Sequence, residues 1–497
     1  MTIIRPRLLA ALFFAVCVCA GLWQLERQRQ GLAIEHVRVG TTPATVYRQP
    51  GASAAPAVVI AHGFAGSRQL MEAYALTLAR AGYVAVSFDF EGHGRNPTPM
   101  SGDVTRIDGT TRLLMRETAG VVAFAQALPG ADGRVALLGH SMSADIIARQ
   151  AMADPSIGAT VAVSMFSEAV TATAPRNLLI VSGEWEGFLR RDALRNARLA
   201  DPAATEGMTV GDPSRGTGRR AVAAPAVEHV GVLYSATALR EARDWLDTTF
   251  GRQSAGPVSA TGGAIVLLLV GIVGLAWPLA GLLPQGATAP AAVPLGTFLA
   301  AVLVPAVLTP ILLAFVETRF LPVLVADYLA VHLLVFGALS LAILHWRGVS
   351  LGPVAWGAAL ALAAYGILVF GGALDRYVAS FWPIVPRMPI IAAIAVGAVP
   401  YMLADSRVTE GGHARWWRML VARAAFIASL GGAVALDFER LFFLLMIIPV
   451  IVLFFTIFGL MGGWVGRRTG SPVASGMALG LLLAWALGVS FPMFSPG

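Results

Sequence analysis

The sequence predicts two kinds of structure in one chain: an α/β domain with a doubly wound, mostly parallel sheet, and an all-α bundle of membrane-spanning helices. The 497 residues are 56% hydrophobic and 13% charged, with a mean hydropathy of +0.70, whereas soluble domains carry about 25% charged residues. Residues 30–250 alternate between short apolar runs and stretches with helical spacing. From Gly263 onward, long apolar stretches follow one another closely.

The basic excess lies in the membrane-like parts of the chain. The net charge is +7, but residues 25–255 contain 23 Arg and 22 acidic residues and are nearly neutral. The remaining excess precedes residue 25 or follows residue 255, where Arg marks orientation in a membrane. We therefore expect membrane lipids, and no nucleic acid, as partners. Protein partners are not predicted by any segment.

The amino terminus has the pattern of a targeting segment. Arg5 and Arg7 precede an uncharged apolar run from Leu8 to Trp23. A basic region followed by an apolar core is typical of a signal peptide or a signal anchor. Small residues around Ala20 suit cleavage, but the run is nearly long enough to span a bilayer. We favour an uncleaved anchor over residues 1–24, and either form delivers the next domain outside the cytoplasmic membrane.

Residues 25–255 form the predicted α/β domain. Stretches with helical spacing, such as 71–81 and 111–127, separate short apolar runs, and this alternation predicts a mostly parallel sheet with both faces covered. The expected strands are 57–61, 83–88, 135–138, 160–165 and 178–181. Ligands bind such sheets at the carboxyl ends of the strands, so chemistry is expected there.

A candidate nucleophile follows the third of these strands. In RVALLGHSMSA, an apolar run meets Gly139-His-Ser141-Met-Ser143 and then a segment with helical spacing. Ser141 is therefore placed on a sharp turn between strand and helix. Such a turn needs small residues two positions on either side of the serine. Gly139 meets this need, and Ser143 replaces the usual second glycine.

Several motifs in this order resemble the α/β-hydrolase superfamily, with its serine esterases, lipases and dienelactone hydrolases. The resemblance covers about residues 35–250. The matching residues are His62-Gly63-Phe64, Phe90-Glu-Gly-His-Gly94, Gly139-His-Ser-Met-Ser143, Gly183-Glu-Trp-Glu186 and Glu228-His229. In this family the chain order is nucleophile, acid, histidine. Ser141, Glu186 and His229 follow that order with about 45 residues between successive members.

The resemblance implies a role for each of these residues. Ser141 would attack an acyl carbon while His229 takes its proton. Glu186 stands where the family has its acid, although Glu is the less common choice; Glu184 and Glu168 remain alternatives. The backbone N–H groups of Phe64 and Met142 would stabilise the oxyanion.

The other histidines near this edge of the sheet are read as motif positions. His62, His93 and His140 have no metal-ligand spacing with one another, so neither a metal nor another cofactor is expected. The segment between the strands near Ser167 and Asn177 is too short for a cap domain. The pocket should therefore be open, or covered by another part of the chain.

Residues 256–497 predict a membrane domain of about eight helices. The expected spans are 263–284, 291–316, 321–346, 351–373, 382–404, 419–436, 441–464 and 473–495. Six arginines lie in alternate connections, on the same side as Arg5 and Arg7: Arg347, Arg407, Arg415, Arg418, Arg467 and Arg468. Positively charged loops face the cytoplasm, so the α/β domain is expected on the extracytoplasmic side.

These observations predict a membrane-anchored serine hydrolase of the inner membrane of a bacterium. Its activity would be of carboxylesterase or lipase type, on an acyl or lipid-like substrate. Two alternatives stay open. One is a peptidase or acyltransferase with the same triad. The other is a transport or scaffold protein whose hydrolase domain binds without cleaving.

Overall fold

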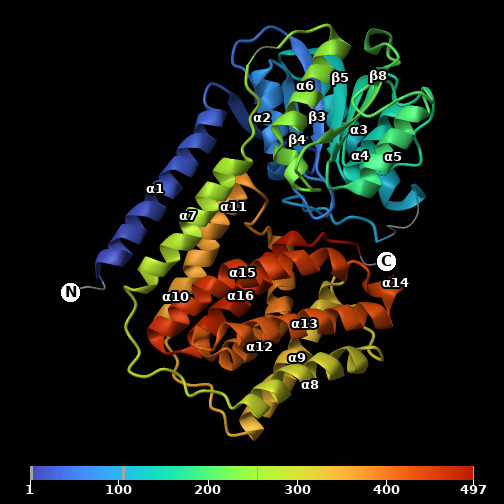
Figure 1. Cartoon of the computed structure of the whole chain (residues 1–497). Helices are drawn as coiled ribbons and strands as arrows, with labels where there is room; N and C mark the ends of the chain where they lie inside the picture. Colours follow the sequence, from blue (N-terminus) through green and yellow to red (C-terminus); the bar gives the residue numbers. More distant parts are fainter. Residues whose placement is uncertain (1–3, 103–106, 255, 496–497) are drawn as a thin grey trace. The chain divides into compact units, whose positions relative to one another are not determined.

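A computed structural model describes residues 4–102, 107–254 and 256–495 of the chain (Figure 1). The chain divides into two compact units. One, the membrane unit, contains the chain up to Cys19 with residues 267–374 and 381–491. The other, the α/β unit, contains residues 20–266, residues 375–380 and the residues from Pro492 onward. Two short segments from the second half of the chain therefore belong to the same unit as the α/β domain.

A nine-stranded sheet forms the centre of the α/β unit, in the order β1-β2-β4-β3-β5-β6-β7-β9-β8. The six strands from β4 to β9 in this order are parallel, whereas β1, β2 and β8 pair antiparallel at the two edges. The strands are β1 (Ala33–Val39), β2 (Thr42–Arg48), β3 (Ala55–Ala61), β4 (Val84–Phe88), β5 (Ala131–His140), β6 (Ile157–Val163), β7 (Leu178–Gly183), β8 (Thr209–Val210) and β9 (Arg219–Ala224). The predicted mostly parallel sheet is confirmed, and the β1–β2 hairpin is added to it.

Helices cover both faces of this sheet (Figure 1). On one face, Leu76 and Leu246 join a buried cluster with Leu138 of β5. On the other, Ala148 and Ala197 pack with strand residues of β6 and β7. The helices are α2 (Glu72–Arg80), α3 (Arg112–Gln126), α4 (Met142–Ala153), α5 (Gly187–Arg198) and α6 (Ala236–Phe250), with short turns η1 (Arg68–Met71), η3 (Pro213–Arg215) and η4 (Gly231–Tyr234). Apolar burial on both faces fixes the carboxyl ends of the strands, where the predicted site lies.

Nine helices in the described part of the chain are long and apolar enough to cross a membrane. Their segments are Pro6–Arg29, Gly262–Ala280, Leu295–Leu313, Ala326–Trp346, Trp356–Tyr377, Val385–Val408, Trp416–Leu436, Leu444–Thr469 and Pro472–Ser490. Seven of them are single helices: α1 (Ile4–Arg29), α7 (Gly262–Ala280), α8 (Leu295–Leu313), α9 (Ala326–Trp346), α13 (Trp416–Leu436), α15 (Leu444–Thr469) and α16 (Pro472–Ser490). The fifth span consists of α10 (Trp356–Ala364), η5 (Tyr365–Phe370) and α11 (Gly371–Tyr377), and the sixth of η6 (Val385–Arg387) and α12 (Met388–Val408). Two short helices, η7 (Glu410–Gly412) and α14 (Phe438–Leu441), lie between spans. The protein is therefore a multi-pass membrane protein.

The last span is shorter than the expected range 473–495. Helix α16 ends at Ser490, and Phe491 has extended backbone angles. Phe491 precedes Pro492, and the residue before a proline disfavours the helical conformation. The residues beyond Pro492 consequently leave the helix and join the α/β unit.

Candidate active site

Ser141 lies on the sharp turn that the sequence predicted between β5 and α4. Its φ of 56° is positive, a strained conformation for a residue with a side chain and one that is concentrated at functional sites. A Cβ built on Gly139 would lie 2.8 Å from the Ser143 hydroxyl oxygen. The crossing of strand and helix is therefore too close for any residue but glycine at position 139.

Ser143, which replaces the usual second glycine, is a fully buried part of the turn. Its hydroxyl accepts a hydrogen bond from the His140 N–H (2.8 Å) and lies 2.9 Å from the carbonyl oxygen of Ala61 in β3. The hydroxyl thus joins the end of β5 to the end of β3. This departure from the glycine motif is an alternative way of stabilising the same turn.

His229 lies between Ser141 and Glu186. Its Nε2 is 2.9 Å from the Ser141 hydroxyl oxygen, and its Nδ1 is 2.5 Å from Glu186 Oε1. The three side chains therefore form one continuous hydrogen-bonded chain, each in contact with the next. His229 comes from the segment between β9 and η4, and Glu186 immediately precedes α5.

The second oxygen of Glu186 is held by two donors. It accepts hydrogen bonds from the Gly183 N–H (2.6 Å) and from the Ser164 hydroxyl (2.7 Å). Burial alone raises the pKa of Glu186, but the bonds from His229, Gly183 and Ser164 outweigh burial and lower its pKa. The carboxylate is consequently ionised at neutral pH and accepts from the imidazole in a fixed orientation.

The alternative acids have other surroundings. Glu184 accepts a hydrogen bond from the Ala226 N–H at 2.7 Å, and Glu168 is exposed on the loop after β6. Of these three carboxylates, Glu186 is the one within hydrogen-bonding distance of His229. The geometry therefore favours Glu186.

The turn after β3 lies against the candidate nucleophile. A Cβ built on Gly63 would be 3.1 Å from the Cβ of Ser141 and 2.9 Å from Nδ1 of His140. Phe64 follows Gly63 in this turn. Met142 is the first residue of α4, where backbone N–H groups have no acceptor within the helix. These positions are compatible with the two predicted oxyanion donors.

His62 connects this turn to the loop after β4. The Phe90 N–H donates to His62 Nε2 at 3.1 Å, so the ring proton is on Nδ1, which lies 2.8 Å from the Gly63 carbonyl oxygen. Burial lowers the pKa of His62, which keeps the ring neutral. His62 is thus a structural residue of the turn that carries Phe64.

Two further side chains contact the candidate triad: His140 contacts His229, and Ser164 contacts Glu186. Neither contact was predicted from the sequence. His140 Nε2 lies 2.9 Å from the His229 carbonyl oxygen, and burial lowers the His140 pKa to about 3. The neutral ring therefore donates from Nε2 and fixes the backbone of His229. Ser164 follows β6 with a positive φ of 52°, which ends the strand two residues earlier than expected. Only the position of each residue at a strand end could have indicated these roles.

Exposed apolar side chains flank these residues. Phe166 and Phe188 lie two residues beyond Ser164 and Glu186, with ring centroids 5.5 Å apart. Trp185 and Val230, adjacent to Glu186 and His229 in sequence, are 68% and 46% exposed. We call these four residues the apolar rim. Exposed apolar side chains are typical of surfaces that bind apolar ligands.

Comparison with known families finds a match in this domain. Residues 52–188 match the family described as serine aminopeptidase, S33. The matched range contains β3, the turn of Ser141, and Glu186. This domain has the α/β-hydrolase fold. The expected resemblance is therefore confirmed for the domain, whereas the match covers less than half of the chain.

Solved structures with similarity to the chain include an esterase from Pyrobaculum calidifontis, at 17% identity and a TM-score of 0.33, over 49% of this chain and 93% of the esterase. A dienelactone hydrolase from Anabaena variabilis has 18% identity and a TM-score of 0.31, over 44% of this chain and 98% of its own. A hypothetical protein from Pseudomonas aeruginosa has 15% identity and a TM-score of 0.33, over 44% and 94%. No curated protein matches the chain.

Proposed function

We propose that this protein is a membrane-anchored serine hydrolase that cleaves an ester-type acyl bond. Ser141 is the proposed nucleophile, His229 the general base and Glu186 the acid that orients it. The observation that carries the proposal is the chain of contacts from Ser141 through His229 to Glu186, at 2.9 and 2.5 Å. A serine hydroxyl is a weak nucleophile unless a neighbouring base removes its proton, and this arrangement supplies that base.

In the proposed reaction, the Ser141 oxygen forms a bond to the acyl carbon while its proton moves to His229 Nε2. The electron pair of the carbonyl bond moves to oxygen, and the N–H groups of Phe64 and Met142 stabilise this oxyanion. Collapse of the intermediate breaks the bond to the alcohol, which leaves with the proton from His229. Water, deprotonated by His229, then attacks the acyl carbon; the bond from this carbon to the Ser141 oxygen breaks, His229 returns the proton to that oxygen, and the carboxylic acid is released.

The apolar rim favours an acyl chain as the substrate group. Phe166, Trp185 and Phe188 present apolar area to solvent beside the proposed triad, and burying such area against a chain contributes about 25 cal/mol per Å². The description of the matched family makes an aminopeptidase the second candidate. An aminopeptidase needs a carboxylate for the substrate amino group; the nearby Glu184 and Glu228 accept hydrogen bonds from backbone N–H groups, and a substrate panel distinguishes the two candidates.

We place the hydrolase domain on the extracytoplasmic face of the bacterial inner membrane. Support comes from the arginines of alternate connections, which include Arg347 and Arg467 and lie on the side of Arg5 and Arg7. With this orientation the substrate pool is outside the cytoplasm, and membrane lipids are the nearest source of acyl groups.

A substrate panel separates the candidates. The full chain in detergent is assayed with p-nitrophenyl esters of two to sixteen carbons, an alanyl anilide, and an acyl donor with an alcohol acceptor. We expect hydrolysis of esters, rising with acyl length, and little cleavage of the anilide. Preferred cleavage of the anilide would favour the peptidase, and transfer to the alcohol the acyltransferase. Folded protein that acts on none of them would favour the non-catalytic scaffold.

A further inference from the structure

Two loops shape the side of the site where the oxyanion donors lie. The first, residues 62–68, is the oxyanion turn after β3, and the second, residues 89–100, is the β4 loop. The His93 ring of the β4 loop lies 5.2 Å from the His62 ring and 5.8 Å from the Phe64 ring, measured between centroids. The conformation of the β4 loop therefore constrains the residue that carries one proposed oxyanion donor.

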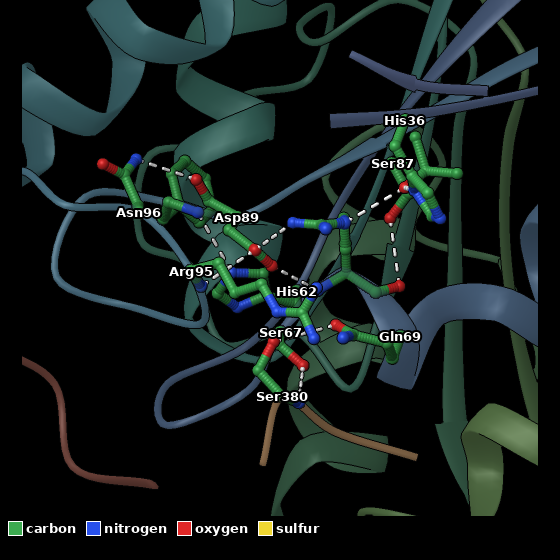
Figure 2. Close-up of polar contacts among 12 residues, drawn as sticks. His36, His62, Ser67, Gln69, Ser87, Asp89, Arg95, Asn96 and Ser380 are labelled. Atoms are coloured by element: carbon green, nitrogen blue, oxygen red, sulfur yellow. Dashed lines mark hydrogen bonds and ion pairs between the residues drawn. The ribbon is translucent and has the colours of Figure 1, made fainter. Parts of the chain in front are cut away.

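Asp89 connects the two loops from within the domain. Its side chain is fully buried and accepts hydrogen bonds from the Arg68 N–H (2.8 Å) and the Arg95 N–H (3.1 Å). It also forms an ion pair with the Arg68 guanidinium. Figure 2 shows Asp89 next to Arg95. Asp89 therefore links the oxyanion turn to the β4 loop.

A segment from far along the sequence binds both loops. Residues 375–380, which we call the connector, begin in the last turn of the span Trp356–Tyr377, extend three residues beyond it and belong to the α/β unit. The Ser380 N–H donates to the Ser67 hydroxyl oxygen at 3.0 Å, and the Ser380 hydroxyl donates to Gln69 Oε1 at 3.2 Å (Figure 2). The Asp375 carboxylate pairs with Arg95 at 2.5 Å. The connector thus contacts the end of the oxyanion turn and the β4 loop together.

The carboxyl-terminal tail, residues 492–495, extends the β4 loop by backbone pairing. The Met493 N–H donates to the Gly92 carbonyl oxygen (2.9 Å), and the Met100 N–H donates to the Met493 carbonyl oxygen (2.8 Å). Met100 and Met493 are 1% and 3% exposed. Gly92 has a φ of 76°, and a Cβ there would lie 2.5 Å from the Met493 carbonyl oxygen. Because Gly92 has no side chain, the β4 loop can approach the tail this closely.

We propose that the connector and the tail hold the oxyanion turn and the β4 loop in their active geometry, so that Ser380 and Asp375 are positioning residues for hydrolysis. The inference rests on the proposed function. Oxyanion donors act only when they lie about 2.7–3.1 Å from the developing charge, and a misplacement of about 1 Å can lower the rate on the order of a hundredfold. Both segments adjoin membrane spans in the sequence but belong to the α/β unit.

The kinetic test uses the full chain with Ser67→Ala and Asp375→Asn combined, which removes the acceptor of Ser380 and the partner of Arg95. We expect kcat on p-nitrophenyl acetate to fall at least tenfold while KM changes less than twofold. The affinity for an alkyl boronic acid, whose adduct places an oxygen at the oxyanion position, should fall by a similar factor. The matched control, Ser156→Ala with Asp132→Asn, removes an exposed hydroxyl and the exposed ion pair to Arg134, and should leave all three values unchanged.

Docking of the connector is tested separately from activity. With Cys17→Ala and Cys19→Ala, the pair Ser67→Cys and Ser380→Cys should form a disulfide under mild oxidation, identified as a linked peptide by mass spectrometry. Absence of this link would overturn the docking. A link together with unchanged kcat in the Ser67 and Asp375 variant would overturn the positioning role alone. A link in the cysteine pair, together with folded wild-type protein that hydrolyses no ester, would overturn the proposed function, and with it the positioning role.

Discussion

At the scale of single residues, Glu186 is the one of the three candidate carboxylates that lies within hydrogen-bonding distance of His229. Replacing it by Gln leaves the shape but removes the charge that orients the imidazole. We expect Glu186→Gln to lower kcat on a short ester on the order of 10⁴-fold. Glu184→Gln and Glu168→Gln should change kcat less than threefold, because these side chains do not contact His229. A larger loss in Glu184→Gln than in Glu186→Gln would refute the assignment.

Burial of His140 makes the stability of the domain depend on pH, with lower stability in acid. The pKa of His140 is lowered from 6.5 to about 3, so the unfolded chain binds a proton that the folded chain excludes between these values. Above pH 6.5 His140 is neutral in both the folded and the unfolded chain and does not change the free energy of unfolding. As the pH falls from 6.5 toward 3, the unfolded chain takes up the proton and the free energy of unfolding decreases. Between pH 7 and pH 5 the loss is about 2 kcal/mol in the free energy of unfolding.

The measurement compares thermal unfolding of wild type and His140→Gln at pH 7 and pH 5. The amide can still donate to the His229 carbonyl oxygen but does not titrate. We expect the unfolding temperature of the wild type to fall more between these two pH values than that of the variant. Equal pH dependence in both proteins would show that His140 does not contribute it.

Some contacts of the candidate site could be predicted from the sequence, and others could not. That Ser141, His229 and Glu186 would lie together could be expected, because the family's motifs follow strand ends in a fixed chain order. His140 and Ser164 could not be assigned their contacts, because a histidine or serine at a strand end has no signature for the neighbour it meets. The second oxygen of Glu186 is held by Ser164 from another strand, and only the folded sheet brings the two together.

At the scale of elements, the turn between β5 and α4 depends on the absence of a side chain at Gly139. A Cβ there would lie 2.8 Å from the Ser143 oxygen and 3.0 Å from the Ser143 carbonyl oxygen. We expect Gly139→Ala to abolish labelling of Ser141 by a fluorophosphonate. Gly120→Ala in α3 is the control, because a Cβ at Gly120 meets nothing within 4 Å and alanine favours the helix. Full labelling of Gly139→Ala would contradict this account of the turn.

The strands and helices that carry the site were largely predictable, and the edges of the sheet were not. Strands β3, β4, β6 and β7 and the buried second part of β5 are near-continuous apolar runs, a pattern that parallel strands produce. The hairpin of β1 and β2 has a mixed pattern because β1 lies at the edge and is partly exposed. Helix α16 ends before its apolar run does, because Pro492 and the pairing of Met493 compete with the helix.

At the scale of the whole molecule, the α/β unit is not confined to one stretch of sequence. The connector and the tail lie outside residues 25–255, and no local pattern shows that they pair with this domain. We therefore expect the excised domain, residues 30–255, to hydrolyse p-nitrophenyl acetate at least tenfold more slowly than the full chain. Circular dichroism serves as the control for folding. Full activity in a folded excised domain would mean that the two segments are dispensable.

The orientation in the membrane is a second prediction at this scale. A reporter that fluoresces only in the cytoplasm should stay dark when fused after residue 255 and should fluoresce when fused after Gly412. The physical reason is that the arginine-rich connections remain on the cytoplasmic side. The reverse pattern would place the hydrolase domain inside the cell, with a different pool of substrates.

The central claim is that Ser141 is a nucleophile activated by His229. The most direct measurement is labelling of the full chain in membranes with a fluorophosphonate, followed by mapping of the adduct by mass spectrometry. The account predicts one adduct, on Ser141, that is lost in Ser141→Ala and in His229→Ala while both variants still insert in the membrane. Folded wild-type protein that stays unlabelled, or that carries the adduct on another residue, would contradict it.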